Sequence, residues 1–340
     1  MLRQQDVGHR IVVRRIVGIR EGRPLFSDAL GELVELSETH LTLATAKGQL
    51  RVPVAQVHRA KRVPPTRRPT ATAVVALERA ADEAWPAPTR GRLGDWLLRS
   101  ADGWTGRANS ALPIGDPDRP LPAAVDAVER WYAELGQPAL INTPLPLAAP
   151  VGAELDARGW AARPPTLVQT TPLPSLASAP AEAPLADLRA TASDAAGAQA
   201  GGWSSAVVEL ASAPSEEWLA IAAGRKGGLP EAARHVLTAV DQVRFAHVYA
   251  DDALVAIGRG AVTGQGRWLG LSLIEVLPSA RRQGLARRVI HELASWGLAG
   301  GATHAFLQVE QRNTAAIALY QRLGFTTHHT YLTRVAPHRA

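Results

Sequence analysis

The stretch PSARRQGLARRVI, residues 278–290, sets one glycine among four arginines, after an apolar run and before an amphipathic helical pattern. A loop that joins a strand end to a helix N-terminus presents backbone N–H groups without partners, at the positive end of the helix dipole. Such a loop is typical of a phosphate-binding site. The alternative is a solvated basic helix end, which is the commoner role of a short charged segment.

The residue types within this loop favour the phosphate interpretation. Arg281 and Gly284 stand at the first and fourth positions of RRQGLA, and the small Ala286 stands at the sixth. A glycine and a small side chain let a pyrophosphate approach the backbone closely, and flanking arginines add charge-assisted hydrogen bonds. The expected binding residues of the loop are Arg281, Arg282, Gln283, Gly284, Leu285, Ala286 and Arg287.

A second motif lies about thirty residues downstream, in VEQRNTAAIALYQRLGF (309–325). Together the two segments resemble the GNAT superfamily of acetyl-CoA-dependent N-acyltransferases. The loop matches the superfamily signature Gln/Arg-x-x-Gly-x-Gly/Ala. Two motifs in the right order indicate the superfamily far more specifically than the loop does alone. The downstream segment matches the element Asn-x-x-Ala-x-x-Leu-Tyr-x-x-x-Gly-Phe at Asn313, Ala316, Leu319, Tyr320, Gly324 and Phe325.

The resemblance implies a cleft where the fourth and fifth strands of the C-terminal lobe splay apart. Acetyl-CoA would bind there, with its pantetheine arm paired along the strand edge from Ile274 to Val276. A neutral amine would attack the thioester carbonyl directly, and a backbone N–H near Val276 would hold the oxyanion. Asn313 is expected both to contact the cofactor and to cap the helix that begins at Thr314.

Two residues carry the expected acid–base chemistry. Tyr320 would protonate the departing thiolate, and Glu275, which interrupts the apolar run LSLIEVL, would take the proton of the amine through water. Glu310 is the second candidate for the base. The alternatives are structural: Tyr320 as a core aromatic on an amphipathic helix, and Glu275 as one half of an ion pair on the sheet.

The remaining pattern predicts an α+β chain of three parts. Residues 8–60 alternate polar and apolar at period two, which indicates a small β-barrel over 1–62, followed by the proline-rich linker RVPPTRRPT. The C-terminal GNAT lobe, a mixed splayed sheet flanked by helices, is expected over 188–337. It would hold a strand at 304–310 and a helix at 314–322.

Residues 70–172 repeat the plan of the C-terminal lobe in weaker form, which favours a duplicated and degenerate GNAT-like lobe. Where the C-terminal lobe has ARRQGLARR, this lobe has GDPDRPLPA, which is acidic and proline-rich and offers no phosphate loop. Asp156 falls near the position of the tyrosine. The proline- and alanine-rich segment 172–188 is expected to join the two lobes.

Composition excludes several classes of chemistry. The chain has no cysteine, and so no disulfide, thiolate ligand or cysteine nucleophile, and its ten histidines show no metal-binding spacing. We therefore expect no metal. No apolar run is long enough to span a membrane, and the N-terminal sequence lacks a secretory pattern. These features predict a cytoplasmic protein without a membrane partner.

The leading hypothesis is an acetyl-CoA-dependent N-acetyltransferase for a primary amine of a small molecule or peptide. The candidate acceptors are small amino acids such as glutamate, an aminoglycoside-like polyamine, and a protein N-terminus or lysine. Its rival is a nucleic-acid-associated regulatory protein with an acyl-CoA-sensing lobe. Residues 1–70 hold 13 Lys and Arg against 6 Asp and Glu, so nucleic acid or another acidic partner would bind the barrel. A basic barrel before tandem lobes is similar to an actinobacterial GNAT subfamily with an N-terminal Src-homology-type barrel. Candidates for the acceptor pocket are Trp203, Trp218, Trp268 and Arg259.

Overall fold

The computed structural model describes residues 2–20, 22–45, 48–63, 69–177, 206–224 and 229–337. The chain divides into two compact units, Met1–Arg68 and Pro69–Ala340. This boundary falls within the proline-rich linker that the sequence indicates. Most of the expected connection at 172–188 lies outside the described residues, as does Trp203.

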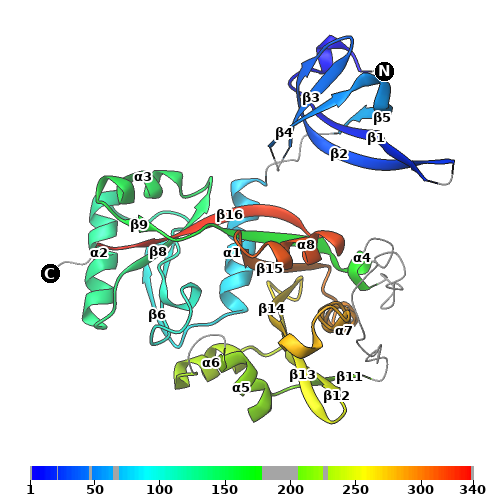
Figure 1. Ribbon diagram of the computed structural model, residues 1–340. Coiled ribbons are helices and arrows are strands. Elements are labelled where there is room, and N and C mark those ends of the chain that lie inside the picture. The colour runs from blue at the N-terminus through cyan, green and yellow to red at the C-terminus, as the bar shows by residue number, and fades with distance from the viewer. Residues whose placement is uncertain are drawn as a thin grey trace. The chain divides into compact units, whose positions relative to one another are not determined.

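The first unit is a single antiparallel sheet, with strands β1 (Arg10–Arg20), β2 (Arg23–Leu36), β3 (His40–Thr45), β4 (Gly48–Pro53) and β5 (Val57–Arg62). Their order is β4-β3-β2-β1-β5. Period-two alternation explains the core, because Ile11 and Val13 of β1 point inward and meet Leu33 and Leu43. Register shifts in β1 and β2 curve the sheet around this cluster (Figure 1). The unit agrees with the small barrel expected from the sequence.

A nine-stranded mixed sheet runs through the second unit. Its strands are β8 (Leu140–Leu145), β9 (Ala161–Ala162), β10 (Thr166–Pro172), β11 (Val207–Ala211), β12 (Val243–Ala250), β13 (Ala253–Thr263), β14 (Trp268–Val276), β15 (His304–Glu310) and β16 (Thr326–Val335). The order is β11-β12-β13-β14-β15-β10-β16-β8, with β9 paired to β16. A separate hairpin joins β6 (Thr89–Leu93) and β7 (Trp96–Ser100). The strand expected at 304–310 is confirmed.

Helices cover both faces of this sheet. They are α1 (Ala71–Glu83), α2 (Leu121–Glu134), α3 (Ala149–Ala157), α4 (Leu173–Ala177), α5 (Glu216–Gly224), α6 (Glu231–Thr238), α7 (Leu285–Ala299) and α8 (Thr314–Arg322). One core cluster contains residues of α1, α5 and α6, and another contains residues of α4 and α7 (Figure 1). Gly258 of β13 permits the close seat of α7, because a Cβ there would lie 2.3 Å from Val289 Cγ1. β14 and β15 are parallel, so β14, α7 and β15 form the expected crossover.

The final strands of the two sequence repeats are exchanged. β10, the last strand of the 70–172 segment, lies between β15 and β16. β16, the last strand of the chain, pairs with β8 from Thr330 to Val335. Thus β10 of the first segment pairs with β15 of the second, and β16 of the second segment pairs with β8 of the first. This reciprocity supports the proposal that the two segments are copies of one plan.

A buried polar contact ties α1 to β16. The carboxylate of Glu78 lies 2.6 Å from Nε2 of His329, and both side chains are almost fully buried. Nδ1 of His329 lies 2.8 Å from Nδ1 of His328, so one of these two nitrogens donates to the other. Burial and the neighbouring His329 lower the pKa of His328 from 6.5 to about 4. The fold therefore favours the neutral ring of His328.

This depressed pKa predicts a loss of stability in mild acid. In the unfolded chain His328 titrates near pH 6.5, and in the folded chain near pH 4. As the pH falls through this window the unfolded state binds a proton that the folded state refuses, so the free energy of unfolding decreases. Between pH 7 and pH 4.5 the melting temperature of the variant His328→Asn should fall less than that of the wild type. Equal losses in the two proteins would contradict the prediction.

The strand exchange predicts how fragments of the chain fold. A fragment of residues 69–340 should keep one cooperative thermal transition, because the second unit has its own cores. A fragment of residues 188–340 alone should show no cooperative thermal transition, because β15 loses its partner β10. Co-expression with residues 69–177 should restore the transition. Circular dichroism during heating measures the thermal transition of both fragments and of the co-expressed pair. A cooperative transition in residues 188–340 alone would contradict the expectation.

Candidate active site

The strands β14 and β15 separate in the middle of the sheet. Their parallel pairing includes Trp268 to Leu271 of β14 and stops there, although both strands continue. On its other side β14 stays paired with β13 as far as Val276, across a register shift. Leu273 lies at this shift with φ 51°, in the left-handed region that few side chains adopt. The edge of β14 from Ser272 to Val276 therefore faces an opening, as the resemblance implies.

Two pockets open along this edge. The inner pocket has a volume of about 650 Å³ and includes Trp85, Arg107 and Glu310 in its lining. The loop pocket has a volume of about 730 Å³ and includes Glu275 and Arg281. Three residues line both pockets, namely Ile274, Asn313 and Tyr320. The two cavities therefore meet at Asn313 and Tyr320 of the second motif and at Ile274 on the edge of β14.

The arginine-rich loop follows directly from β14. Arg282 and Gly284 have φ values of 63° and 79°, and Gly284 is the N-cap of α7. Within the described part of the chain, the backbone N–H groups of residues 282–286 donate no hydrogen bond. Successive free N–H groups at a helix N-terminus form a concave site for anions. Nε of Arg281 donates to the carbonyl oxygen of Val276 at 3.2 Å, which fixes the loop to the end of β14.

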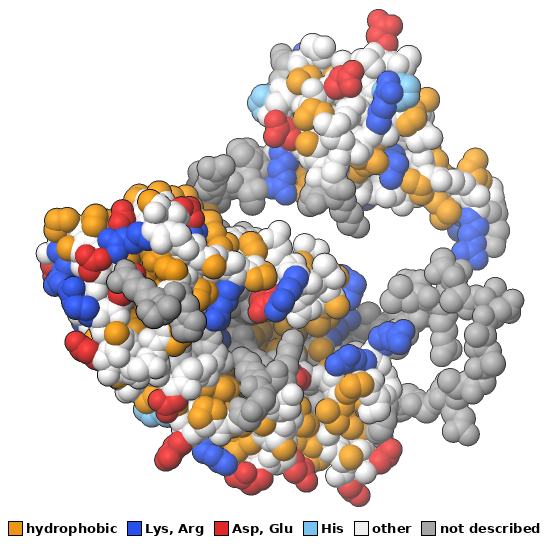
Figure 2. Space-filling view, turned by 60° about the vertical axis from the view of Figure 1, so that its left-hand side comes forward, with side chains coloured by type: hydrophobic (Ala, Val, Ile, Leu, Met, Phe, Trp, Pro, Cys, Tyr) orange, Lys and Arg blue, Asp and Glu red, His pale blue; other side chains and the backbone are white. Residues whose placement is uncertain are grey.

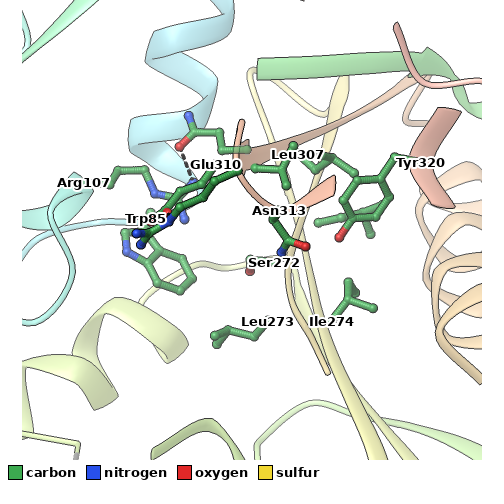
Figure 3. A pocket seen from close by; sticks show the side chains of 13 residues that line it. Trp85, Arg107, Ser272, Leu273, Ile274, Leu307, Glu310, Asn313 and Tyr320 are labelled. Atoms are coloured by element: carbon green, nitrogen blue, oxygen red, sulfur yellow. Dashed lines mark hydrogen bonds and ion pairs between the residues drawn. The ribbon is translucent and has the colours of Figure 1, made fainter. Parts of the chain in front are cut away.

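Asn313 and Tyr320 project from α8 into the opening. Asn313 Oδ1 accepts a hydrogen bond from the N–H of Ala316 at 3.2 Å, so its expected role as the cap of α8 is confirmed. The ring of Tyr320 packs edge-on against Phe325, with the centroids 5.8 Å apart. Figure 3 shows the Tyr320 hydroxyl turned into the cavity, on the side of Asn313. Tyr320 is thus anchored in the core by its ring and presents its hydroxyl to the pocket.

The two candidate bases lie on different pockets. Glu275 is half-buried on β14 and lines the loop pocket. Glu310, at the end of β15, lines the inner pocket, and its carboxylate is engaged by Arg312 at 2.5 Å. The structure thus brings Glu275 and Tyr320 to one cavity and Glu310 and Tyr320 to the other.

The wall of the inner pocket opposite Tyr320 contains residues that the sequence does not single out. Trp85 follows α1, and Arg107 begins the short turn Arg107–Asn109 after β7. The Arg107 guanidinium carbon lies 4.5 Å from the Trp85 ring, and Nη1 donates to Oε1 of Gln308 at 2.9 Å. Both Trp85 and Arg107 come from the degenerate segment. No local motif marks them, because their place depends on strand pairing far away in sequence.

The three residues expected at the acceptor pocket that lie within the described ranges are placed elsewhere. Trp218 is fully buried in the core, where it packs against Phe245. Trp268 packs against Phe306 at the other end of β14. Arg259 is buried and donates to the carbonyl oxygens that end two helices, including that of Ala84 at 2.9 Å. Their role in the structure is packing and helix capping.

The degenerate segment lacks a comparable anion site at the start of α2. Pro120 is the N-cap of that helix and Pro122 follows in its first turn, so two of the positions there have no N–H. Asp156, which falls near the position of the tyrosine in the repeat, forms an ion pair with Arg334 of β16. This segment therefore contributes to the pocket through its wall rather than through a second phosphate loop.

No group of three or more His, Asp or Glu side chains is placed to hold a metal ion among the described residues. No helix in the described ranges is long and apolar enough to cross a membrane.

Comparison with known proteins identifies the family. The family model "Probable histone acetyltransferase Rv0428c C-terminal" matches residues 71–333, which is most of the chain. The chain belongs to this family. It is 29% identical to the probable histone acetyltransferase Rv0428c of Mycobacterium tuberculosis, over 97% of this chain and 95% of that protein. It is 28% identical to the uncharacterized N-acetyltransferase YobR of Bacillus subtilis, over 76% of this chain and 98% of that protein.

A solved structure confirms the fold. A GCN5-related N-acetyltransferase from Kribbella flavida superposes with a TM-score of 0.58 at 16% identity, covering 78% of this chain and 96% of that one. The expected α+β fold of GNAT type is thereby confirmed. Family membership makes the protein an acetyl-CoA-dependent acyltransferase that acetylates an amine.

The loop geometry predicts the effect of a substitution at Gly284. A Cβ there would meet nothing within 4 Å, so the positive φ, not space, requires glycine. Gly284→Val should distort the row of N–H groups and weaken acetyl-CoA binding by roughly tenfold or more, as measured by calorimetry. Gly159→Val is the matched control, because Gly159 has φ 73° with equal free space but lines neither pocket. Equal affinities in Gly284→Val and wild type would exclude the loop as the binding site.

Proposed function

We propose that the protein transfers the acetyl group of acetyl-CoA to a primary amine by direct attack, within the cleft between β14 and β15. One observation carries the proposal: the free edge of β14, Arg281 at the start of the loop and Tyr320 all line two cavities that share Ile274, Asn313 and Tyr320. The loop pocket would take the cofactor and the inner pocket would take the acceptor. The two substrates would then meet at Ile274, Asn313 and Tyr320.

The residues around the loop pocket fit the chemistry of acetyl-CoA. The N–H groups of residues 282–286 offer an anion site for the pyrophosphate, and Arg281 and Arg287 flank them. The backbone of Ile274 to Val276 offers the hydrogen-bonding groups that a strand partner would otherwise use, which suits the amides of pantetheine. Acetyl-CoA supplies the activated acetyl thioester. The N–H near Val276 would stabilise negative charge on the thioester oxygen.

Proton transfer is assigned to two side chains. Tyr320 would donate its proton to the departing thiolate sulfur, because its hydroxyl faces the point where the two pockets meet. Glu275 would take the proton of the incoming amine through water, since it lines the same cavity as Tyr320. Glu310 remains the second candidate for the base, but its carboxylate is already engaged by Arg312.

The rival function, a nucleic-acid-associated regulator, has less support. The relatives that match most of the chain are named as acetyltransferases. Two of the arginines in the first unit are paired with carboxylates, Arg14 with Asp28 and Arg62 with Asp6. On the face of the first unit that Figure 2 shows, basic and acidic side chains are intermixed rather than gathered by sign. It stays a prediction that the barrel docks an acidic partner. It also stays a prediction that the chain belongs to the subfamily with an N-terminal Src-homology-type barrel.

Tyr320→Phe tests the proposed acid. The substitution keeps the ring and its contact with Phe325 but removes the proton, so turnover should fall by roughly 10²- to 10⁴-fold. Acetyl-CoA affinity and melting temperature should change little. Thiol release from acetyl-CoA measures turnover, and calorimetry measures affinity.

Tyr132→Phe is the matched control for this loss of a hydroxyl. The Tyr132 hydroxyl is buried and donates to the carbonyl oxygen of Arg99 at 2.8 Å, away from both pockets. Its removal should lower the melting temperature and leave turnover as it is. An unchanged turnover in Tyr320→Phe would assign Tyr320 to the core instead.

A further inference from the structure

The inner pocket ends in a cationic wall that the proposed chemistry leaves unused. Figure 3 shows Trp85 and Arg107 on the side of the cavity away from Tyr320. Arg107 forms no ion pair with any described carboxylate. Its Nη1 donates to Gln308 Oε1, which also accepts from the hydroxyl of Tyr331 at 3.2 Å. The neutral amide thus orients the guanidinium without neutralising its charge.

The charges around this wall are unbalanced. Arg259, fully buried, lies 5.3 Å from the same Trp85 ring that Arg107 covers. Burial lowers the pKa of Arg107, and burial together with Arg107 lowers the pKa of Arg259. Glu78 and Asp82 act on Arg107 in the opposite direction, but each is already bonded to another side chain. A bound anion would therefore relieve an existing cost in electrostatic energy.

The excess of positive charge continues beyond the inner pocket. An adjoining cavity of about 380 Å³ shares Arg107, Gln308, Glu310 and Arg312 with it and adds Arg163. Glu310 is the one carboxylate among the described residues that line these two cavities. It faces three arginines, and it is paired with Arg312 only. A cationic acceptor would meet repulsion here, and an anionic one attraction.

The turn that carries Arg107 is held rigidly by Asn109. The buried Asn109 side chain accepts from the N–H groups of Ala101 and Gly103 and donates to the carbonyl oxygens of Trp104 and Thr105, at 2.7–2.9 Å. Four hydrogen bonds from one amide tie the end of the turn to the loop that precedes it. Arg107 is thus preorganised before any acceptor arrives, which lowers the entropic cost of binding.

We infer that the acceptor is a primary amine that also carries a carboxylate, and that Arg107 binds this carboxylate at the far end of the inner pocket. The inference rests on the proposed N-acetyl transfer. Arg107 has Nη1 bonded to Gln308, so Nε and Nη2 remain for the two oxygens of a planar carboxylate. The acceptor then spans the cavity, with its amine directed toward Tyr320. Arg107 acts as a specificity-determining residue, and Asn109 and Gln308 position it.

The test compares amino acids with their own carboxamides as acceptors. Each pair shares the amine and the side chain and differs in the carboxylate alone. The amine of a carboxamide is the less basic of the two, so more of it is neutral and reactive, and the chemistry itself favours the carboxamide. For the best amino-acid acceptor we expect kcat/KM to exceed that of its carboxamide by roughly 10- to 100-fold, mainly through KM.

Two variants test the assignment to Arg107. Arg107→Gln should bring the ratio of the two kcat/KM values close to one. Gln308→Glu places a carboxylate where the amide now accepts from Arg107 and Tyr331, so it keeps both hydrogen bonds and supplies an internal anion. It should raise KM for the amino acid more than for the carboxamide, without lowering the melting temperature. Arg234→Gln is the matched control, an exposed arginine that lines none of the three cavities, and its ratio should equal that of the wild type.

The outcomes separate this inference from the proposed function. If carboxamides or a lysine-bearing basic peptide are acetylated as well as or better than amino acids, the carboxylate inference is wrong and the acetyl transfer stands. The same holds if Gln308→Glu, still folded, keeps the wild-type ratio. If acetyl-CoA binds but no amine of any charge is acetylated, the proposed function fails and the inference fails with it.

Discussion

The separation of β14 from β15 is the constraint on which the rest of the site depends. Backbone N–H and C=O groups inside a sheet need partners, and an interrupted ladder leaves them exposed at a cost unless a ligand or water replaces the missing strand. Here the ladder ends at Leu271, and Leu273 adopts a left-handed conformation in the remaining part of β14. The free edge, the two cavities and the placement of the arginine-rich loop all follow from that divergence.

The exchange of final strands explains why a degenerate segment is kept. β10 covers the side of β15 that faces away from β14, so the divergence leaves β15 anchored on one edge. The same segment brings the end of α1 and the turn after β7 to the cleft, and with them Trp85 and Arg107. Arg259 connects the two parts further, since it caps the carbonyl of Ala84 and those at the end of α6. One segment thus supplies the two sequence motifs and the other supplies a wall of the inner pocket.

Sequence reasoning reaches the elements whose signals are local. The bounds of β15 and α8, the Asn313 cap and the glycine at the start of α7 are encoded in spacing and residue type. The partner of a strand is not encoded locally, so periodicity shows β10 and β16 as strands but not their exchange. Arg107 could not be found for the same reason. Trp218 and Arg259 look like pocket residues because aromatic and cationic side chains serve both ligands and cores, and burial decides between them only in three dimensions.

Arginine serves the two ends of this site in different ways. At the loop, Arg281 and its neighbours are exposed or half-exposed and supplement backbone N–H groups, which suits a diffuse and strongly charged phosphate. At the inner wall, Arg107 is partly buried, packed on Trp85 and held by a neutral amide. A partly buried charge discriminates more sharply than an exposed one, because water relieves less of the cost of leaving it unpaired. Gln308 matters for this reason: an acidic residue at its place would neutralise Arg107 inside the protein, whereas the amide orients the guanidinium and keeps its charge available for the acceptor.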